Sequence, residues 1–144
     1  MKFVTRAHAK VDRVACPWLI TRFIDPAAEF LFVEPGDVLA VATREGAILF
    51  DVPGVELGHH GDLCSFDAVI ARYQVSAPGL ERMARIVRGA DTGAKGLENE
   101  SWGLEAIAGG FRAVASDDHE LMRLEFPMYD ALYAYCRGLE ATAG

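Results

Sequence analysis

Short hydrophobic runs separated by turn residues dominate the first third of the chain. Residues 3–7 alternate weakly between apolar and polar, whereas 29–34 and 47–52 are compact apolar runs typical of buried strands. Pro and Gly close the latter two runs at 35–36 and 53–54. The pattern predicts a small sheet of about three strands, whose order it does not fix.

A helix is predicted between the first two strands, because apolar residues recur at helical spacing over 15–23. A start at Asp12 would place Pro17 beyond the first turn, where the helix needs its missing N–H. We therefore expect this helix to begin near Cys16, with Pro17 at the first helical position, and to stop before Pro26. It would form the crossover between two parallel strands.

The rest of the chain has mostly helical spacing. A short helix is predicted at 38–43, and longer ones are predicted to begin at Ser65, at about Ser76 and at about Ser101. A last helix would follow 116–120, with Pro127 kinking or dividing it. The fold class is α+β and mainly helical, with a small N-terminal sheet of about three strands packed on a C-terminal helical layer.

Composition narrows the protein class. The 144 residues, 51% hydrophobic and 24% charged, suit a single domain over 1–144. A net charge of -7 argues against a nucleic-acid footprint spread over the whole surface. Three cysteines far apart argue against a disulfide framework and for a reducing compartment. With no signal peptide and no transmembrane stretch, we expect a cytoplasmic protein without membrane attachment.

The stretch 57–67 gathers the residue types that bind metals. His59 and His60 are followed by the thiol of Cys64 and the carboxylate of Asp67, with glycines on both sides of the histidine pair. Imidazole is the commonest protein metal ligand, and a nearby carboxylate can bind the same ion. No standard zinc motif is present, so a tight polar turn before a helix is the alternative.

Two further residues are candidate ligands. Asp91 continues the apolar stripe of its helix and lies at the C-terminal end, where the helix dipole disfavours negative charge and a cation should compensate. Arg88, one turn earlier, or a metal ion would supply that charge. His119 is either a surface residue in a first helical turn or an additional imidazole ligand.

Five segments together resemble the C-terminal domain of the chromate resistance protein ChrB. They follow in the expected order: KVDRVACPWLITRFIDP at 10–26, DVPGVELGHHG at 51–61, CSFD at 64–67, IVRGAD at 86–91 and MYDALYAY at 128–135. Full-length members of this family are chromate-responsive regulators with an N-terminal DNA-binding part, which this chain lacks. The resemblance implies a role in chromate sensing or tolerance without autonomous nucleic-acid binding.

The resemblance also implies a ligand set. His59 matches the histidine most often present in relatives, whereas the position of His60 is commonly another residue. Asp67 matches an acid in relatives, which fits a ligand. Arg88 stands where relatives have a histidine that forms a His-x-x-Asp pair with the acid matching Asp91. The expected metal ligands are therefore His59, Asp67, Asp91 and His119, with His60 as the substitute, and this mixed set suits Fe, Mn or Zn.

Two function classes follow. As a sensing or resistance module, the domain would bind chromate or another small oxyanion through arginines able to make paired hydrogen bonds. Arg13, Arg22 and Arg88 are the candidates, each of which is otherwise an ion-pair partner of a nearby acid: Asp12, Asp25 or Asp91.

The alternative is a metal-dependent enzyme, either a reductase of an oxidised metal species or a metal-assisted hydrolase. Cys16 or Cys64 would act as reductant or nucleophile if a helix start stabilised its thiolate, although a lone cysteine is more often packing material. A purely structural domain without a ligand is a third reading. Self-association into a homo-oligomer is left open.

Overall fold

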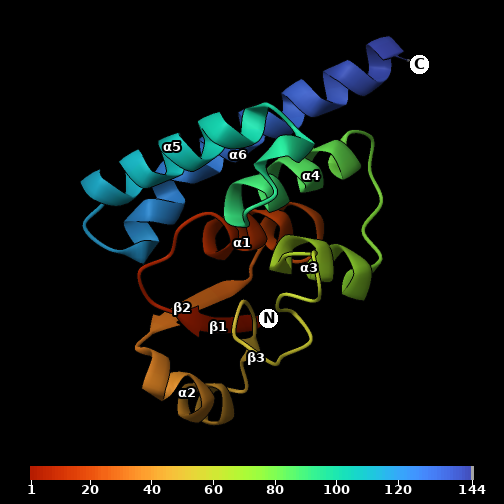
Figure 1. Cartoon of the computed structure of the whole chain (residues 1–144). Coiled ribbons are helices and arrows are strands. Elements are labelled where there is room, and N and C mark those ends of the chain that lie inside the picture. The colour runs from red at the N-terminus through yellow and green to blue at the C-terminus, as the bar shows by residue number, and fades with distance from the viewer. Residues whose placement is uncertain (144) are drawn as a thin grey trace.

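Three short parallel strands form the predicted sheet, in the order β2-β1-β3. The computed structural model describes residues 1–143 (Figure 1). Its elements are β1 (Lys2–Arg6), α1 (Asp12–Phe23), β2 (Glu29–Val33), the 3-10 turn η1 (Pro35–Asp37), α2 (Val38–Glu45), β3 (Ile48–Leu49), α3 (Ser65–Tyr73), α4 (Leu80–Asp91), the 3-10 turn η2 (Lys95–Leu97), α5 (Glu100–Val114) and α6 (Asp118–Ala143). The predicted α+β class, with α1 as the crossover between β1 and β2, is confirmed.

Both faces of the central strand are buried. Phe3 belongs to the main core on the α1 side, where its ring stacks on that of Phe30. Val4, which points the other way, packs in a second cluster with Val38 and Val41 of α2. Figure 1 shows α1 and α2 on opposite sides of the strands. Because both faces of β1 are covered, its three central residues Phe3, Val4 and Thr5 are all buried.

The remaining helices lie on the α1 side of the sheet, away from α2. In Figure 1, α5 and α6 run side by side along the top of the molecule; α6 packs directly on α1, and α4 contacts α1, α5 and α6. Trp18 of α1 lies against Tyr129 and Tyr133 of α6, with ring centroids 6.3 and 5.8 Å apart. Its indole N–H donates to Asp130 at 2.7 Å, so the amphipathic ring satisfies its polar atom while burying its body.

The predicted start of α1 is wrong. The helix begins at Asp12 rather than near Cys16, and Pro17 lies inside it. Burial explains why the early turn forms despite the missing hydrogen bond: Val14, Ala15 and Cys16 are completely buried in the core. Tertiary packing therefore outweighs the local cost of the proline.

Other boundaries differ as well. The fourth helix begins at Leu80 rather than near Ser76, and β3 is shorter than the apolar run that predicted it. The last helix is not divided, because α6 continues through Pro127.

Candidate metal centre

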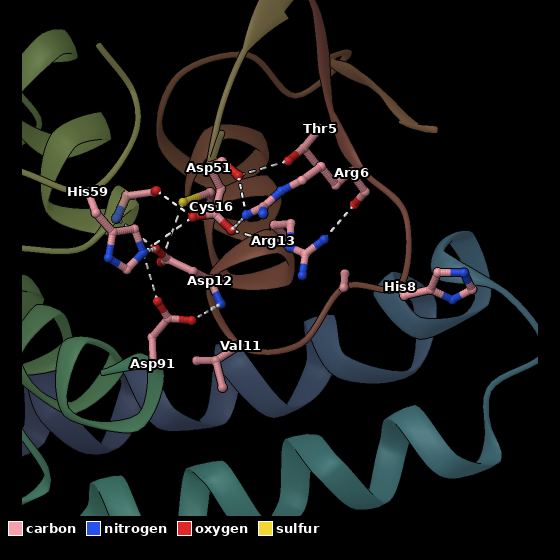
Figure 2. Close-up of polar contacts among 12 residues, drawn as sticks. Thr5, Arg6, His8, Val11, Asp12, Arg13, Cys16, Asp51, His59 and Asp91 are labelled. Carbon is pink, nitrogen blue, oxygen red and sulfur yellow. Dashed lines mark hydrogen bonds and ion pairs between the residues drawn. The ribbon is translucent and has the colours of Figure 1, made fainter. Parts of the chain in front are cut away.

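Four ionisable side chains meet beyond the carboxyl ends of β1 and β3, the edge where parallel sheets commonly bind ligands. Asp12 opens α1 after the loop that leaves β1, and Asp51 follows β3 closely. His59 comes from the long connection between β3 and α3, and Asp91 is the last residue of α4. Figure 2 shows the His59 ring pointing towards these carboxylates.

One nitrogen of His59 approaches all three acids. Its Nε2 lies 3.0 Å from Asp91 Oδ2, 3.3 Å from Asp51 Oδ1 and 3.5 Å from Asp12 Oδ2. Three of the four side chains, Asp12, His59 and Asp91, each offer one ligand atom. These three atoms lie within 4.8 Å of one another. Metal–ligand bonds of about 2.0–2.2 Å place neighbouring ligand atoms roughly 3–4 Å apart, so a small rearrangement would let these three side chains share one ion.

Two backbone N–H groups hold the Asp12 carboxylate in place. Asp12 Oδ2 accepts the backbone N–H of Ser65 at 2.6 Å, and Oδ1 accepts that of Phe66 at 3.1 Å. These are orphan donors at the start of α3, so Asp12 caps a helix distant in the sequence and lies at its positive end.

The other two carboxylates are anchored in the same way. Asp91 Oδ1 accepts the backbone N–H of Asp12 at 3.2 Å. Asp51 Oδ1 accepts the hydroxyl of Ser65 at 2.8 Å, and its Oδ2 lies 3.3 Å from Arg13 Nε. These contacts fix the orientation of the Asp51 and Asp91 carboxylates, as outer contacts do for the ligands of a metal site.

The local electrostatics favour a cation. Burial and the charges of Asp12 and Asp51 raise the pKa of Asp91 to about 7. The hydrogen bond to Asp12 and the surrounding carboxylates raise the pKa of His59 to about 9, against an opposing effect of burial. Without a metal, a protonated His59 therefore supplies the positive charge that three adjacent carboxylates require.

The site opens into a cleft of about 520 Å³. Besides the four acid and histidine side chains, the cleft is lined by Arg6, Lys10 and Arg13. Carboxylates and cations thus share one cavity.

The sequence of nearly the whole chain matches a known family. The model of the ChrB C-terminal domain matches residues 3–136. The chain is 36% identical over 135 residues to Protein ChrB of Cupriavidus metallidurans. The aligned region covers 93% of this chain and 40% of that protein. The chain belongs to the ChrB C-terminal domain family. It spans about two fifths of the length of this curated ChrB, and no solved structure matches it.

Within residues 1–143, no helix has both the length and the apolar character needed to cross a membrane.

In this ChrB domain, two of the five expected metal ligands converge. His59 and Asp91 belong to the cluster that could share an ion. Asp67 instead accepts the backbone N–H of Cys64 at 3.0 Å, as part of a capping box on α3. Over residues 1–143, that cluster also contains neither His60 nor His119.

The other two histidines have different surroundings. His60 is exposed, and its Nε2 lies 2.7 Å from the carbonyl oxygen of Glu56. His119, also exposed, packs edge-on against Phe32 with ring centroids 5.5 Å apart.

The three candidate arginines are separated. Arg13 alone lines the cleft with the acidic cluster. Arg22 forms a bidentate pair with Asp130 of α6, at 2.9 and 3.0 Å, and Arg88 pairs with Asp67 at 3.4 Å. The expected ion-pair partners Asp12, Asp25 and Asp91 were wrong, because each arginine pairs with an acid that only the tertiary fold brings near: Asp51, Asp130 and Asp67.

Both candidate thiols are buried. Burial, reinforced by the negative charge of Asp12, raises the pKa of Cys16 and of Cys64 above the ordinary thiol value. The folded domain therefore disfavours the thiolate that a nucleophile or reductant requires.

Sequence reasoning missed Asp12 and Asp51 as partners of His59. Pro17 argued against a helix start at Asp12, whereas α1 does begin there and the Asp12 side chain caps α3. Both residues lie in segments that resemble the family, at 10–26 and 51–61. Those segments were the available signal, since no spacing rule links positions so far apart.

Proposed function

We propose that this ChrB domain binds a divalent transition metal ion through Asp12, His59 and Asp91 and acts in chromate sensing or tolerance. The observation that carries the proposal is the position of His59 Nε2, within 3.5 Å of three separate carboxylates. A mixed nitrogen and oxygen set suits Mn²⁺, Fe²⁺ or Zn²⁺.

The arrangement favours a ligand site over a purely structural ion-pair cluster. Asp12 is 1% exposed and Asp51 8%, and burying carboxylates so close together costs stability unless a cation compensates. His59, in contrast, is 43% exposed at its side chain and lies on the cleft wall. An ion entering from solvent can therefore reach the carboxylates.

A metal-dependent enzyme is the second candidate. The open cleft favours it, because a cavity beside a bound metal admits water or a substrate to the ion. Since both thiols near the site are buried, chemistry there would rely on the metal and on the side chains that line the cleft.

Metal binding by chelator-treated protein tests the proposal. Mn²⁺, Zn²⁺ and anaerobic Fe²⁺ are added, unbound metal is dialysed away, and the bound metal is counted by mass spectrometry. We expect close to one equivalent of at least one of these ions per chain. His59→Ala should abolish binding, and Asp91→Asn should weaken it by about tenfold or more.

His60→Ala is the matched control, because it removes the adjacent, exposed imidazole. It should bind as the unaltered protein does. If His59→Ala keeps its metal, or if the unaltered protein takes up none of the three ions, the proposed site is wrong. A folded far-ultraviolet spectrum for each variant separates loss of binding from loss of structure.

A further inference from the structure

The outward face of α5 is apolar. The helix packs against η2, α4 and α6, and its other side faces outward at the top of the molecule (Figure 1). Trp102, Ile107 and Val114 are 63%, 51% and 71% exposed. Apart from Glu105, every exposed residue of α5 is apolar or glycine. The outer face of a surface helix normally carries charged and polar side chains, so this apolar face indicates an interaction surface.

Three glycines lie among these exposed residues. A Cβ added to Gly103, Gly109 or Gly110 would meet no atom of the described chain within 4 Å, and none of the three has a positive φ. A glycine inside a helix lowers its stability relative to alanine. Packing within the chain therefore gives no steric reason for these glycines, whereas the close approach of another backbone does.

The sequence of α5 repeats every seven residues. Residues 102–108 read WGLEAIA, and residues 109–115 read GGFRAVA. Positions seven apart lie on nearly the same line along a helix, so glycine, alanine and a β-branched residue each recur at one place on the outward side. Charge is the exception, because Arg112 stands seven residues after Glu105.

This charge reversal indicates which partner fits the face. In an antiparallel pair of α5 helices, a two-fold axis between Ala108 and Gly109 places Glu105 of each copy opposite Arg112 of the other. A parallel pair in register would instead place like charges together. The side chains of Glu105 and Arg112 are 49% and 27% exposed, and each also pairs within its own chain, with Lys95 and Asp118. The charges therefore set the orientation of the pair more than its affinity.

The same two-fold axis makes the apolar edge self-complementary. It places Ile107 opposite Gly110 of the second copy and Val114 opposite Gly103. Each large side chain then faces a glycine, which is how facing helices interdigitate at close approach. A single helix thus complements itself in both size and charge.

We propose that α5 is the interface of a homodimer, in which its outward face packs antiparallel on the same face of a second copy. This inference is independent of the proposed metal site. The helix has 15 residues and is about 22 Å long, so the contact is small. We expect a dissociation constant on the order of micromolar to tens of micromolar. Far below that concentration the chain is monomeric, and alanine at these glycines then acts on helix stability alone.

Sedimentation equilibrium of the whole chain, from about 1 µM to about 500 µM, tests the dimer. We expect a monomer–dimer equilibrium. Gly110→Leu should weaken it by at least about tenfold, because the larger side chain blocks the close approach. Ile107→Ser should weaken it by about tenfold, since each copy loses apolar contact area. Leu39→Ser, which removes a 69% exposed side chain on α2, is the matched control and should change nothing.

Charge variants test the antiparallel orientation. Glu105→Arg and Arg112→Glu should each weaken the dimer by about three- to tenfold, because like charges then face each other across the two-fold axis. An equimolar mixture of these two variants should dimerise more tightly than either variant alone, since each Arg then faces a Glu. Far-ultraviolet spectra check that every variant is folded.

The outcomes separate the parts of the proposal. A chain that stays monomeric at the highest concentration overturns the homodimer. Self-association that Gly110→Leu and Ile107→Ser both leave unchanged shows that α5 is not the interface. A dimer that Gly110→Leu weakens but Glu105→Arg does not affect overturns the antiparallel arrangement. Gly110 faces open space in the single chain, so its variant keeps the test decisive if Arg112→Glu is destabilised.

Discussion

Asp12 links two helices and the candidate metal site through a single carboxylate. It holds the first backbone N–H groups of α3 while Oδ2 also faces His59. A carboxylate oxygen has more than one lone pair, so a metal can bind while these hydrogen bonds persist. In the proposed metal site, Asp12 would therefore be positioned before an ion arrives, which favours tight binding.

Glu125 is a buried carboxyl group that lies outside the cleft. Its side chain on α6 is 0% exposed, and within residues 1–143 neither carboxylate oxygen has a hydrogen-bond partner. Burial raises its pKa from 4.5 to about 8. Because the folded protein holds this proton more tightly than the unfolded chain, the associated stability is complete below about pH 4.5 and is lost as the pH rises through about 8.

Glu125→Gln should remove this pH dependence. The unfolding free energy of the variant minus that of the unaltered protein should therefore be larger at pH 9 than at pH 5, by an amount on the order of a few kcal/mol. Urea unfolding of metal-free protein at both pH values measures the difference. Glu29→Gln, at an exposed position of β2, is the control and should show no such gain. If the variant and the unaltered protein differ in unfolding free energy by the same amount at pH 5 and at pH 9, the raised pKa of Glu125 is wrong.

For single residues, the sequence predicted which side chains are candidate metal ligands better than it predicted which side chains they contact. The histidine pair and the acid ending an apolar stripe identified His59 and Asp91 as candidate ligands. Asp12 and Asp51 could not be joined to them by spacing, because the contacts depend on loops between separate elements. His60, next to His59 in the sequence, faces the Glu56 carbonyl instead, since neighbouring loop side chains need not point the same way.

At the scale of elements, Gly89 sets how closely α4 and α5 approach. A Cβ added there would lie 2.3 Å from Ser101 Oγ and 2.9 Å from Ser101 Cβ. Ser101 is fully buried and donates its hydroxyl to the carbonyl oxygen of Ile86 at 2.8 Å, so it has little freedom to move. This contact also fixes the end of α4, where Asp91 lies.

Gly89→Ala should therefore destabilise the protein by about 1–3 kcal/mol, the usual cost of overpacking. Gly103→Ala, on the exposed side of α5, meets no atom within 4 Å and should stabilise the helix by about 0.5–1 kcal/mol. Thermal and urea unfolding measure both changes. Opposite signs for the two alanine variants are the expected result, and stabilisation by Gly89→Ala would show that α5 is not packed this closely.

Element types followed from periodicity, whereas boundaries depended on packing. Two apolar runs and one weakly alternating segment predicted three strands, and the α1 crossover made β1 and β2 parallel as expected. Pro17 gave the wrong start for α1 because local rules count a missing hydrogen bond but not the burial that surrounds it. Proline interrupted neither α1 nor α6, which shows that the tertiary environment decided both helices.

At the scale of the whole molecule, one hydrophobic core connects the site to the distant helices. This core includes residues of β1, β2, α1, α3, α4, α5 and α6. The proposed metal ligands come from α1, from the loop before α3 and from the end of α4. Because one core joins these elements, an ion bound only to the folded state should stabilise the entire domain.

The three buried thiols report on that coupling, because Cys16, Cys64 and Cys136 all belong to the same core cluster. Cys16 lies beside the site, with Sγ 3.7 Å from Asp12 Oδ1, whereas Cys136 is on α6. If the thiols react only through global opening, Mn²⁺ at 100 times its Kd should slow the labelling of all three by about 100-fold.

Thiol labelling followed by peptide mass spectrometry measures each rate separately, and His59→Ala should show no effect of Mn²⁺. Slowing confined to Cys16 and Cys64 would mean that the site region opens without α6. The cooperative unit would then be smaller than the core that the packing defines.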